Sequence, residues 1–346
     1  MASTGAIDEF DLIARVFRPL AADHPASLGL VDDAALIDPG AGNEIVVTTD
    51  SLSEGIHFRS EDAPEIVASR ALGSNISDLA AMGAIPIGYT LALAAPKSTK
   101  MDWFEAFADG LGTEQVRYET GLIGGDTTSS SGGLMITITA LGCVPAGCAV
   151  RRSTAQAGND VWVTGTIGDA ALGLDILQGR LKSRTRQDRD ALIERFNRPT
   201  ARIAAVPLLR RFATAAIDVS DGLAADLGHI GEVSTLIADI ERDAIPLSEA
   251  AQRLAEQPGT GGRALLSRVI SGGDDYEIVF TAPTEDRDAI DTHAADLNLR
   301  VSRIGTVSSP TEQRPAGNVR VLDDRGEALI IDGPGGYRHF QRGPGE

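Results

Sequence analysis

Segments rich in β-branched residues alternate with longer segments that carry apolar side chains at helical spacing, and this alternation restricts the fold more than any other feature of the chain. β-Branched runs favour strands, whereas apolar residues three and four positions apart favour amphipathic helices. In the first half we predict strands at residues 44–49, 87–95 and 134–144. The helices that alternate with them are predicted at residues 7–20, 64–84 and 101–119. Strands that alternate with helices indicate the α/β class.

A polar stretch with a glycine, Arg151–Asp160, marks the boundary between two domains that we predict at residues 1–150 and 151–346. A length of 346 residues also exceeds that of one typical core. Beyond the boundary we predict a helix at 170–178 and a charged, exposed connection at 179–190. Further strands complete a second mixed α/β set, at residues 161–164, 217–220, 236–240, 278–281, 301–307 and 319–322.

The formal net charge of −18 excludes several classes of partner. A field of this sign repels nucleic acids and anionic lipid, so we expect neither as a main partner. It would also repel ATP unless cations intervened. The lysines of the chain are Lys97, Lys100 and Lys182, and none of them follows a glycine, so a Walker-type GK[ST] loop is absent. If this chain binds a phosphate group, it must therefore do so through another kind of site.

The two cysteines, Cys143 and Cys148, lie five residues apart. A single pair without a histidine cluster is a poor candidate for a metal site, so we expect free thiols in a reducing compartment. The sequence shows no charged-then-apolar signal at its start and no run of about 18 apolar residues. We therefore expect a cytoplasmic protein with no membrane partner.

Acidic residues recur where apolar segments end, and small neighbours leave room beside them for a ligand or a hydrated ion. They are Asp32, Asp33, Asp50, Asp78, Asp126, Asp218, Asp221, Asp274 and Asp275. Any one of them could be a helix cap or a turn residue, since aspartate favours both positions. Repeated placement at strand ends favours a shared role, because Mg²⁺ binds a few carboxylates together with substrate phosphates. Several such ions would also offset the repulsion of ATP.

Two segments with Gly-Asp pairs add groups that suit phosphate. Gly124–Thr128 (GGDTT) lies between a short apolar segment and the flexible SSSGG, and it offers N–H groups, a carboxylate and hydroxyls. Ser271–Glu277 (SGGDDYE) is similar, although ordinary turns also contain such pairs. The turn at 165–173 (GTIGDAALG) fits a nucleotide loop or a tight strand-to-helix turn. His57 fits either a ligand contact or an ordinary surface or core position.

A series of motifs in fixed order resembles the thiamine-monophosphate kinase family. These motifs are DDAAL, TTDSLSEGIHF, NISDLAAMGA, LIGGDTT, RRST, TGTIGDAALGL, IDVSDGLAADLGHI and SGGDDYE, and the resemblance runs from EFDLIARVF to GGYRHF. The family belongs to a superfamily of ATP-using enzymes that includes aminoimidazole ribonucleotide synthetase. The resemblance implies an aminoimidazole ribonucleotide synthetase-like fold of two α/β domains. It also implies that the N-terminal domain binds ATP and magnesium and forms a homodimer through its sheet.

The same resemblance implies in-line transfer of the ATP γ-phosphoryl group to thiamine monophosphate, the final step of thiamine diphosphate biosynthesis. The acceptor already carries a charged phosphate oxygen, so we expect no covalent intermediate and no general base. Residues implied to hold several Mg²⁺ ions are Asp33, Thr48, Thr49, Asp50, Asp78, Asp126, Asp218 and Asp221. Those implied to contact ATP are Gly125, Asp126, Arg152 and Ser220, and those implied to contact thiamine monophosphate are His57, Asp274 and Tyr337.

Two positions depart from the family pattern. Val31 stands where glycine usually precedes the first acidic pair, and Asp274 stands where glutamate is frequent, which puts the substrate geometry in question. Within the superfamily, selenophosphate synthetase is disfavoured because the first cysteine is Cys143. The hydrogenase-maturation member is disfavoured because this sequence ends in GPGE rather than in a cysteine. Aminoimidazole ribonucleotide synthetase and a non-enzymatic acidic metal- or nucleotide-binding module remain alternatives, and a turnover assay would separate the module from a kinase.

Overall fold

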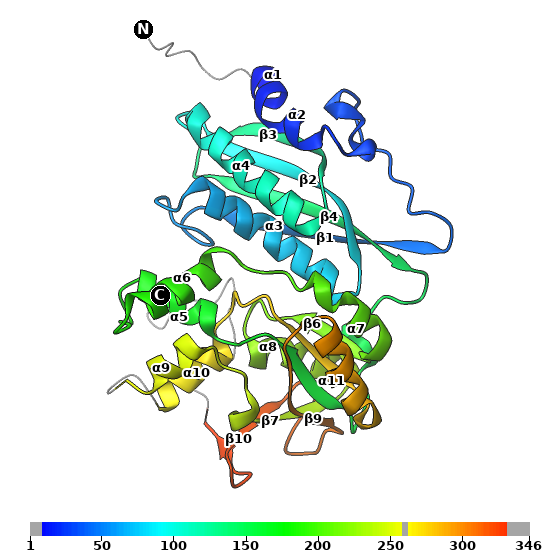
Figure 1. Cartoon of the computed structure of the whole chain (residues 1–346), viewed down its shortest axis with the longest axis vertical. Helices are drawn as coiled ribbons and strands as arrows, with labels where there is room; N and C mark the ends of the chain where they lie inside the picture. The colour runs from blue at the N-terminus through cyan, green and yellow to red at the C-terminus, as the bar shows by residue number, and fades with distance from the viewer. Residues whose placement is uncertain (1–8, 258–261, 331–346) are drawn as a thin grey trace. The chain divides into compact units, whose positions relative to one another are not determined.

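Two separate sheets organise residues 9–257 and 262–330, the part of the chain that this computed structural model describes (Figure 1). Each sheet belongs to one of two units. The first unit contains the chain up to Leu79 and Ala84–Cys148, and the second contains Ala80–Gly83 and the chain from Ala149 onward. Within the described residues, no helix has the length and apolar character needed to cross a bilayer.

The sheet of the first unit has four strands in the order β1–β4–β2–β3. Their bounds are β1 (Asn43–Ser53), β2 (Ile85–Pro96), β3 (Leu122–Ser130) and β4 (Met135–Pro145). The central strands β2 and β4 pair antiparallel, β1 pairs antiparallel with β4, and β3 pairs parallel with β2. The outer strands β1 and β3 therefore lie at opposite edges of this sheet.

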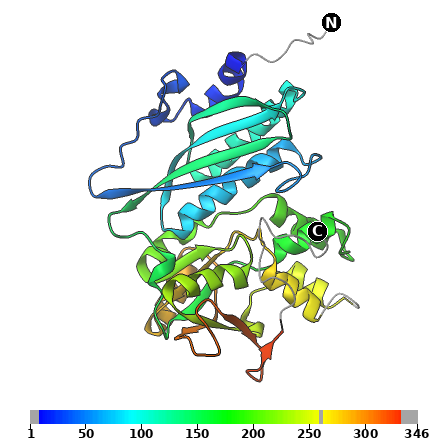
Figure 2. The same ribbon diagram turned by 180° about the vertical axis from the view of Figure 1, so that it is seen from behind.

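Two long helices, α3 (Pro64–Ala81) and α4 (Met101–Tyr118), cover one face of this sheet (Figure 1). Gly110 of α4 makes their close contact possible, because a Cβ there would lie 2.7 Å from the Glu65 Cα on α3. The side chains of Leu91 and Ile138 point to this covered face and are buried. The opposite face, seen from behind in Figure 2, carries none of the described helices.

The first turns of the chain differ in part from the predicted helix at 7–20. The described helical residues run as α1 (Glu9–Leu12), a π-helical segment (Ile13–Phe17) and α2 (Arg18–Ala21), followed by a 3₁₀ segment at Pro25–Leu30. The strands predicted at 44–49, 87–95 and 134–144 and the helices predicted at 64–84 and 101–119 are confirmed.

The sequence does not predict the strand that contains the GGDTT motif, and this strand also includes the first two serines of the SSSGG segment. Residues Leu122–Ser130 form one continuous strand, β3, whose backbone pairs with β2 from Tyr89 to Pro96. Glycine and aspartate are poor strand formers on their own, but the exposed edge of β2 supplies the ladder of hydrogen bonds. The GGDTT residues are therefore held in an extended strand.

The second unit contains a seven-stranded sheet in the order β11–β10–β7–β9–β5–β8–β6. The strands are β5 (Asp160–Thr164), β6 (Ala215–Asp218), β7 (Ile237–Glu241), β8 (Ile278–Ala282), β9 (Val301–Ser308), β10 (Val319–Leu322) and β11 (Ala328–Leu329). Only the β10–β7 pair is parallel among these strands. The predicted strands of this half and the predicted mixed α/β class are confirmed.

Helices of the second unit are α5 (Asp169–Leu177), α6 (Arg186–Asn197), α7 (Val206–Phe212), α8 (Leu223–Ser234), α9 (Glu249–Ala255), α10 (Arg263–Ser271) and α11 (Arg287–Asp296). Short 3₁₀ segments lie at Arg152–Thr154, Ile203–Ala205, Arg242–Ala244 and Thr284–Asp286. The prediction of an exposed connection at 179–190 was wrong in its last residues, which begin α6. Thr185 caps α6, and the side chains of Leu192 and Phe196 in this helix are buried.

Candidate active site

Strand β1 and helix α3 bring three of the predicted metal residues together in the first unit. The Thr48 hydroxyl donates a hydrogen bond to the Asp78 carboxylate at 2.5 Å. The backbone N–H of Asp50 donates to Oδ1 of Asn75, one turn before Asp78 on the same helix, at 3.1 Å. Thr48 and Asp50 are two residues apart on a strand, so both side chains point toward α3. Thr48, Asp50 and Asp78 thus form one cluster of oxygen donors.

Burial of Asp50 raises the pKa of its carboxyl group, and a hydrogen bond from Ser74 of α3 opposes that shift. A raised pKa means that the charged form is disfavoured where it lies. A divalent cation beside Asp50 would restore the charged form. The donor set of this cluster contains carboxylates and a hydroxyl, which fits Mg²⁺ better than a metal that prefers nitrogen or sulfur.

Thr49 lies between Thr48 and Asp50 on β1, and its side chain points to the other face of the sheet. Its hydroxyl shares a hydrogen bond of 2.8 Å with the hydroxyl of Thr139 on β4. Next along the same face, Ser51 and Thr137 share one of 2.7 Å. This uncovered face is therefore lined with hydroxyl groups near Asp50, although the Asp50 side chain itself points away from it.

The opposite edge of the sheet holds a second group, Asp33, Gly125 and Asp126. These residues line a cavity of about 150 Å³, whose apolar walls include Ile13, Phe17, Leu30, Leu91 and Leu122. Only glycine fits at position 125 of this strand, because a Cβ there would lie 2.1 Å from the Leu91 carbonyl oxygen. The carboxylates of Asp33 and Asp126 are exposed. Two acidic groups beside an apolar hollow suit a ligand with one charged and one apolar part.

The two groups are separated by the width of the sheet. Asp50 pairs with Ile138, Ile138 pairs with Leu91, and Leu91 pairs with Gly125. Three strand spacings of about 4.8 Å put β1 and β3 roughly 14 Å apart at this level. Asp126, one residue further, points to the uncovered face. Within one chain, the structure does not bring Asp50 and Asp126 to a common metal ion.

His57 lies in the turn that follows β1. Its Nδ1 accepts a hydrogen bond from the backbone N–H of Ser53 at 3.0 Å. The neighbouring Glu54 accepts the N–H of Leu134 at 2.8 Å, and this bond lowers the pKa of the Glu54 carboxyl group. Because Nδ1 is the acceptor, the ring proton of neutral His57 is on Nε2. The ring can therefore present an N–H donor to an acceptor atom.

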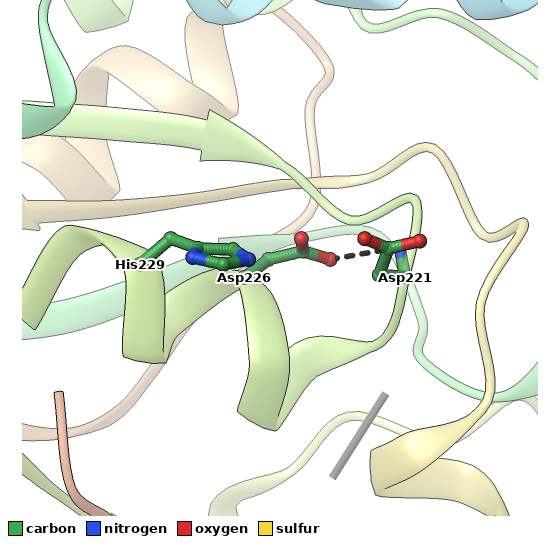
Figure 3. Close-up of side chains that lie close together, drawn as sticks. All are labelled: Asp221, Asp226 and His229. Carbon is green, nitrogen blue, oxygen red and sulfur yellow. Dashed lines mark hydrogen bonds between the residues drawn. The ribbon is translucent and has the colours of Figure 1, made fainter. Parts of the chain in front are cut away.

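In the second unit, Asp218, Ser220 and Asp221 lie where β6 ends and α8 begins. Asp218 is buried, with 2% of its surface exposed, whereas Ser220 and Asp221 are half-buried. A further acidic residue, Asp226 of α8, lies beside them. One of its carboxylate oxygens accepts the N–H of Asp221 at 3.1 Å (Figure 3). Burial and the charge of Asp221 raise the pKa of Asp226 to about 7.

Asp221, Asp226 and His229 offer ligand atoms that all lie within 4.8 Å of one another (Figure 3). His229 is on the exposed side of α8, where it also lies 3.6 Å from Glu232. Arg152 is exposed, and its positive charge opposes the rise in the pKa of Asp226. The backbone of Arg152 is tied to α8, since the Ser234 hydroxyl donates to its carbonyl oxygen at 2.9 Å. Arg152, Ser220 and Asp221 thus belong to one neighbourhood.

The backbone of the SGGDDYE segment is hydrogen-bonded to the turn that contains Ser220. Asp274 has a φ of 70°, and its N–H donates to the carbonyl oxygen of Ser220 at 2.9 Å. Asp275 is fully buried and accepts the N–H groups of Gly168 and Ala170 at 2.6 and 3.0 Å. Burial raises the pKa of Asp275 to about 8 despite these two bonds.

Glu277, two residues further, anchors the segment from the opposite side. It is fully buried and accepts hydrogen bonds from the Thr164 hydroxyl at 2.7 Å and from the guanidinium groups of Arg195 and Arg202. Tyr337, which the resemblance implies as a substrate contact, lies outside the described residues.

Comparison with known proteins agrees with these motifs. Residues 31–144 match the family model for the N-terminal domain of AIR synthase related proteins. The thiamine-monophosphate kinase of Salmonella typhimurium is 42% identical over 89% of this chain and 92% of its own length. The chain belongs to the thiamine-monophosphate kinase family. The family resemblance predicted from the motifs is thereby confirmed, and with it the enzyme class.

Solved structures of this family share the fold. The thiamine-monophosphate kinase of Stenotrophomonas maltophilia K279a superposes with a TM-score of 0.79 at 41% identity, over 93% of this chain and 98% of that one. AaThiL complexed with AMPPCP and TMP superposes with a TM-score of 0.75 at 29% identity, over 98% and 100% of the two chains. The predicted aminoimidazole ribonucleotide synthetase-like fold is confirmed.

Sequence reasoning misses two residues that organise the candidate site. Asn75 and Asp226 lie within the family motifs NISDLAAMGA and IDVSDGLAADLGHI, but neither is predicted from the sequence as a site residue. Asn75 is fully buried and Asp226 has 2% of its surface exposed. The available signal is spacing, since Asn75 lies three residues before Asp78 on α3, and Asp226 lies five residues after Asp221 in the first turn of α8.

Proposed function

We propose that this chain transfers the γ-phosphoryl group of ATP directly to thiamine monophosphate and so produces thiamine diphosphate. The observation that carries the proposal is the likeness to AaThiL, which was solved with AMPPCP and TMP bound and aligns with 98% of this chain. AMPPCP is an analogue of ATP, so that protein holds a nucleotide and a phosphate ester together. Residues 1–150 would form the ATP- and magnesium-binding domain, and residues 151–346 the C-terminal domain.

Magnesium is implied by the family and fits the residues present. Asp33, Thr48, Thr49, Asp50, Asp78, Asp126, Asp218 and Asp221 are the residues proposed to hold several ions, and all offer oxygen donors. The raised pKa of Asp50 supports this role, because a buried carboxyl group of this kind gains from a cation. When bound, the ions would neutralise charge on the triphosphate and on the transferred group.

The side chains of the chain itself would bind and align the two substrates. Gly125 is proposed to contact the triphosphate through its backbone, and the exposed guanidinium of Arg152 presents planar donors to phosphate. Ser220 would add a hydroxyl donor. His57, Asp274 and Tyr337 are proposed to contact thiamine monophosphate, with His57 donating through Nε2. The acceptor phosphate is already ionised, so alignment in line with the γ-phosphorus would be the main contribution of the protein.

We further infer that the chain forms a homodimer through the uncovered face of the first sheet. Val47, Ile85 and Met135 lie on that face with 58%, 43% and 48% of their surfaces exposed. A second copy packed on this face would remove these side chains from water, and a two-fold interface needs only one such surface. Light scattering should give about twice the chain mass of 36.2 kDa. A monomer at micromolar concentration would contradict this inference.

The positions of Asp50 and Asp126 support a site shared between the two copies. Asp126 points to the uncovered face at the β3 edge, and Thr49 points to the same face at the β1 edge. If the β3 edge of one copy lies against the β1 edge of the other, Asp126 meets Thr49 across the interface, while the Asp50 side chain on the same strand β1 points to the covered face. We propose that each active site takes Asp50 from one copy and Asp126 from the other, with the two carboxylates on separate magnesium ions.

The reaction is tested by incubating the purified chain with ATP, magnesium chloride and thiamine monophosphate. Thiamine diphosphate should form in equal amount to ADP, and removal of magnesium should stop its formation. Release of ADP and inorganic phosphate without thiamine diphosphate would contradict the proposed acceptor. Nucleotide binding without any turnover would indicate a binding module instead of a kinase.

The free thiols of Cys143 and Cys148 fit the expected cytoplasmic location.

A further inference from the structure

A single buried carboxylate holds the turn between β6 and α8. Oδ2 of Asp226 accepts the backbone N–H groups of Ser220, Asp221 and Gly222 at 3.1, 3.1 and 3.0 Å. Asp226 lies in the first turn of α8 and has 2% of its surface exposed. Three N–H groups that converge on one oxygen fix three consecutive peptide planes of the turn. They are groups for which no strand or helix supplies a partner.

This arrangement goes beyond the capping of a helix. In a capping box, an acidic residue in the first turn reaches back to one N–H, that of the residue before the helix. Asp226 reaches that N–H on Gly222 and also the two before it. Gly222 has a φ of 131°, a conformation that other residues rarely adopt. The turn is therefore shaped around the carboxylate.

The turn is held from its other side by the SGGDDYE segment. The N–H of Asp274 donates to the carbonyl oxygen of Ser220, and the N–H of Tyr276 donates to that of Val219, both at 2.9 Å. At Gly273 a Cβ would lie 2.1 Å from the Ser220 carbonyl oxygen, so only glycine fits there. Ser220 is thus fixed through its N–H by Asp226 and through its carbonyl by Asp274.

We propose that Asp226 is a positioning residue for the phosphoryl transfer, acting through the backbone of the Ser220–Gly222 turn. The proposal rests on the proposed function, in which Ser220 contacts the ATP phosphates and Asp221 holds a metal ion. In this role Asp226 acts as a hydrogen-bond acceptor, since its Oδ2 accepts all three N–H groups, and the role does not require a metal ion on its other oxygen. Its loss would let the turn relax and misplace both Ser220 and Asp221.

Two substitutions separate acceptance of hydrogen bonds from charge. Asp226→Ala removes the acceptor, and we expect at least a tenfold rise in the KM for ATP together with a lower kcat. Asp226→Asn keeps a carbonyl oxygen at the same place, so kcat/KM should stay within about threefold of the original chain. Binding of magnesium-AMPPCP, measured by calorimetry, should weaken in Asp226→Ala and be largely retained in Asp226→Asn.

Asp188 provides the matched control. It is also a buried aspartate in the first turn of a helix, α6, where it pairs with Arg253. Asp188→Ala should lower the melting temperature but leave the KM for ATP unchanged. If Asp226→Ala behaves in the same way, Asp226 is only a structural cap and the proposal is wrong.

The Asp226→Asn variant keeps the test decisive if Asp226→Ala does not fold. A folded Asp226→Asn that loses magnesium-AMPPCP binding as strongly as turnover would show that the charge is needed, which contradicts an acceptor role. Retained binding and turnover would support the proposal. Failure of the unsubstituted chain to make thiamine diphosphate would instead count against the proposed function.

Discussion

The first unit carries most of its candidate residues on strands and a helix, whereas the second unit carries most of its candidate residues on loops. In the first unit, the Thr48 hydroxyl bonds to the Asp78 carboxylate, and the Asp50 N–H bonds to the side chain of Asn75. In the second unit, the turn at 220–222 and the segment at 272–276 depend on buried carboxylates that accept backbone N–H groups.

The difference follows from where the backbone hydrogen bonds go. A strand satisfies its N–H groups through the ladder, so its register alone decides which side chains share a face. A loop has no ladder, and buried N–H groups without partners are costly. In the second unit Asp226 and Asp275 meet that need. A substitution in the first unit should therefore act on one ligand group, while one in the second should move a whole loop.

The largest expected effect is on the first unit. Asp50→Asn and Asp126→Asn should each lower turnover by about a hundredfold or more, because each removes a charge that a metal ion needs, and each 1.36 kcal/mol corresponds to a factor of ten. The melting temperature without ligands should stay flat or rise, since crowded carboxylates repel one another without the ions. Asp109→Asn, at an exposed position of α4, is the control and should change neither quantity.

These two variants also decide between the metal role and a structural role. An aspartate that only caps a helix or a turn would lose about 1 kcal/mol of stability on substitution, with little change in rate. Steady-state rates at limiting magnesium make the distinction. Normal turnover of both variants under that condition would return Asp50 and Asp126 to the structural role.

A smaller effect is expected at the substrate end of the first unit. His57→Ala removes the N–H donor proposed for thiamine monophosphate, so its KM should rise by about tenfold, the equivalent of one hydrogen bond to a charged group. The KM for ATP should change much less and serves as the internal control. Initial rates with each substrate varied in turn measure both. A larger rise in the KM for ATP would mean that the two substrates are assigned to the wrong residues.

The smallest expected effect is a change of stability with pH in the second unit. Burial raises the pKa of Asp275 to about 8, whereas an aspartate in an unfolded chain has a pKa of about 3.9. Its contribution to the free energy of unfolding is therefore fully present below about pH 4 and is lost as the pH rises toward about 8. Asp275→Asn cannot ionise and should lack this decline.

Chemical denaturation of both proteins between pH 5 and pH 9 measures the difference. The exposed Asp288→Asn on α11 is the control and should follow the pH dependence of the unsubstituted chain. If the stability of Asp275→Asn has the same pH dependence as that of the unsubstituted chain, Asp275 does not titrate in this range, and its bonds to Gly168 and Ala170 keep it ionised.

The sequence predicts most strands of both units and the helices α3, α4 and α5, but it predicts neither helices α6 to α11 nor the contacts that hold the irregular parts. Runs such as those in β1 and β8 are recognised from their β-branched residues. Strand β3 is missed because GGDTTSS has low strand propensity, and only the free edge of β2 makes it extended. Helix α6 is missed because three of the four residues of its first turn are charged, while Leu192 and Phe196 bury its other side.

For the candidate site, motifs predict which residues gather but not on which side of a sheet they lie. Asp50 and Asp126 look equivalent in the sequence, since each is a carboxylate next to threonine hydroxyls. Strand order and register separate them, and both depend on pairings between residues far apart in the chain. The role of Asp226 is hidden for a similar reason, because spacing alone does not tell a ligand from an acceptor of backbone N–H groups.

A mixed dimer tests the shared site most directly. Asp50→Asn and Asp126→Asn chains with different affinity tags are produced together, and dimers that carry both tags are purified and assayed for thiamine diphosphate. If each site takes Asp50 from one copy and Asp126 from the other, one site of every mixed dimer is intact, and turnover should be about half that of the unsubstituted dimer. Turnover as low as that of either variant alone would contradict the shared site and would mean that both aspartates act within one chain.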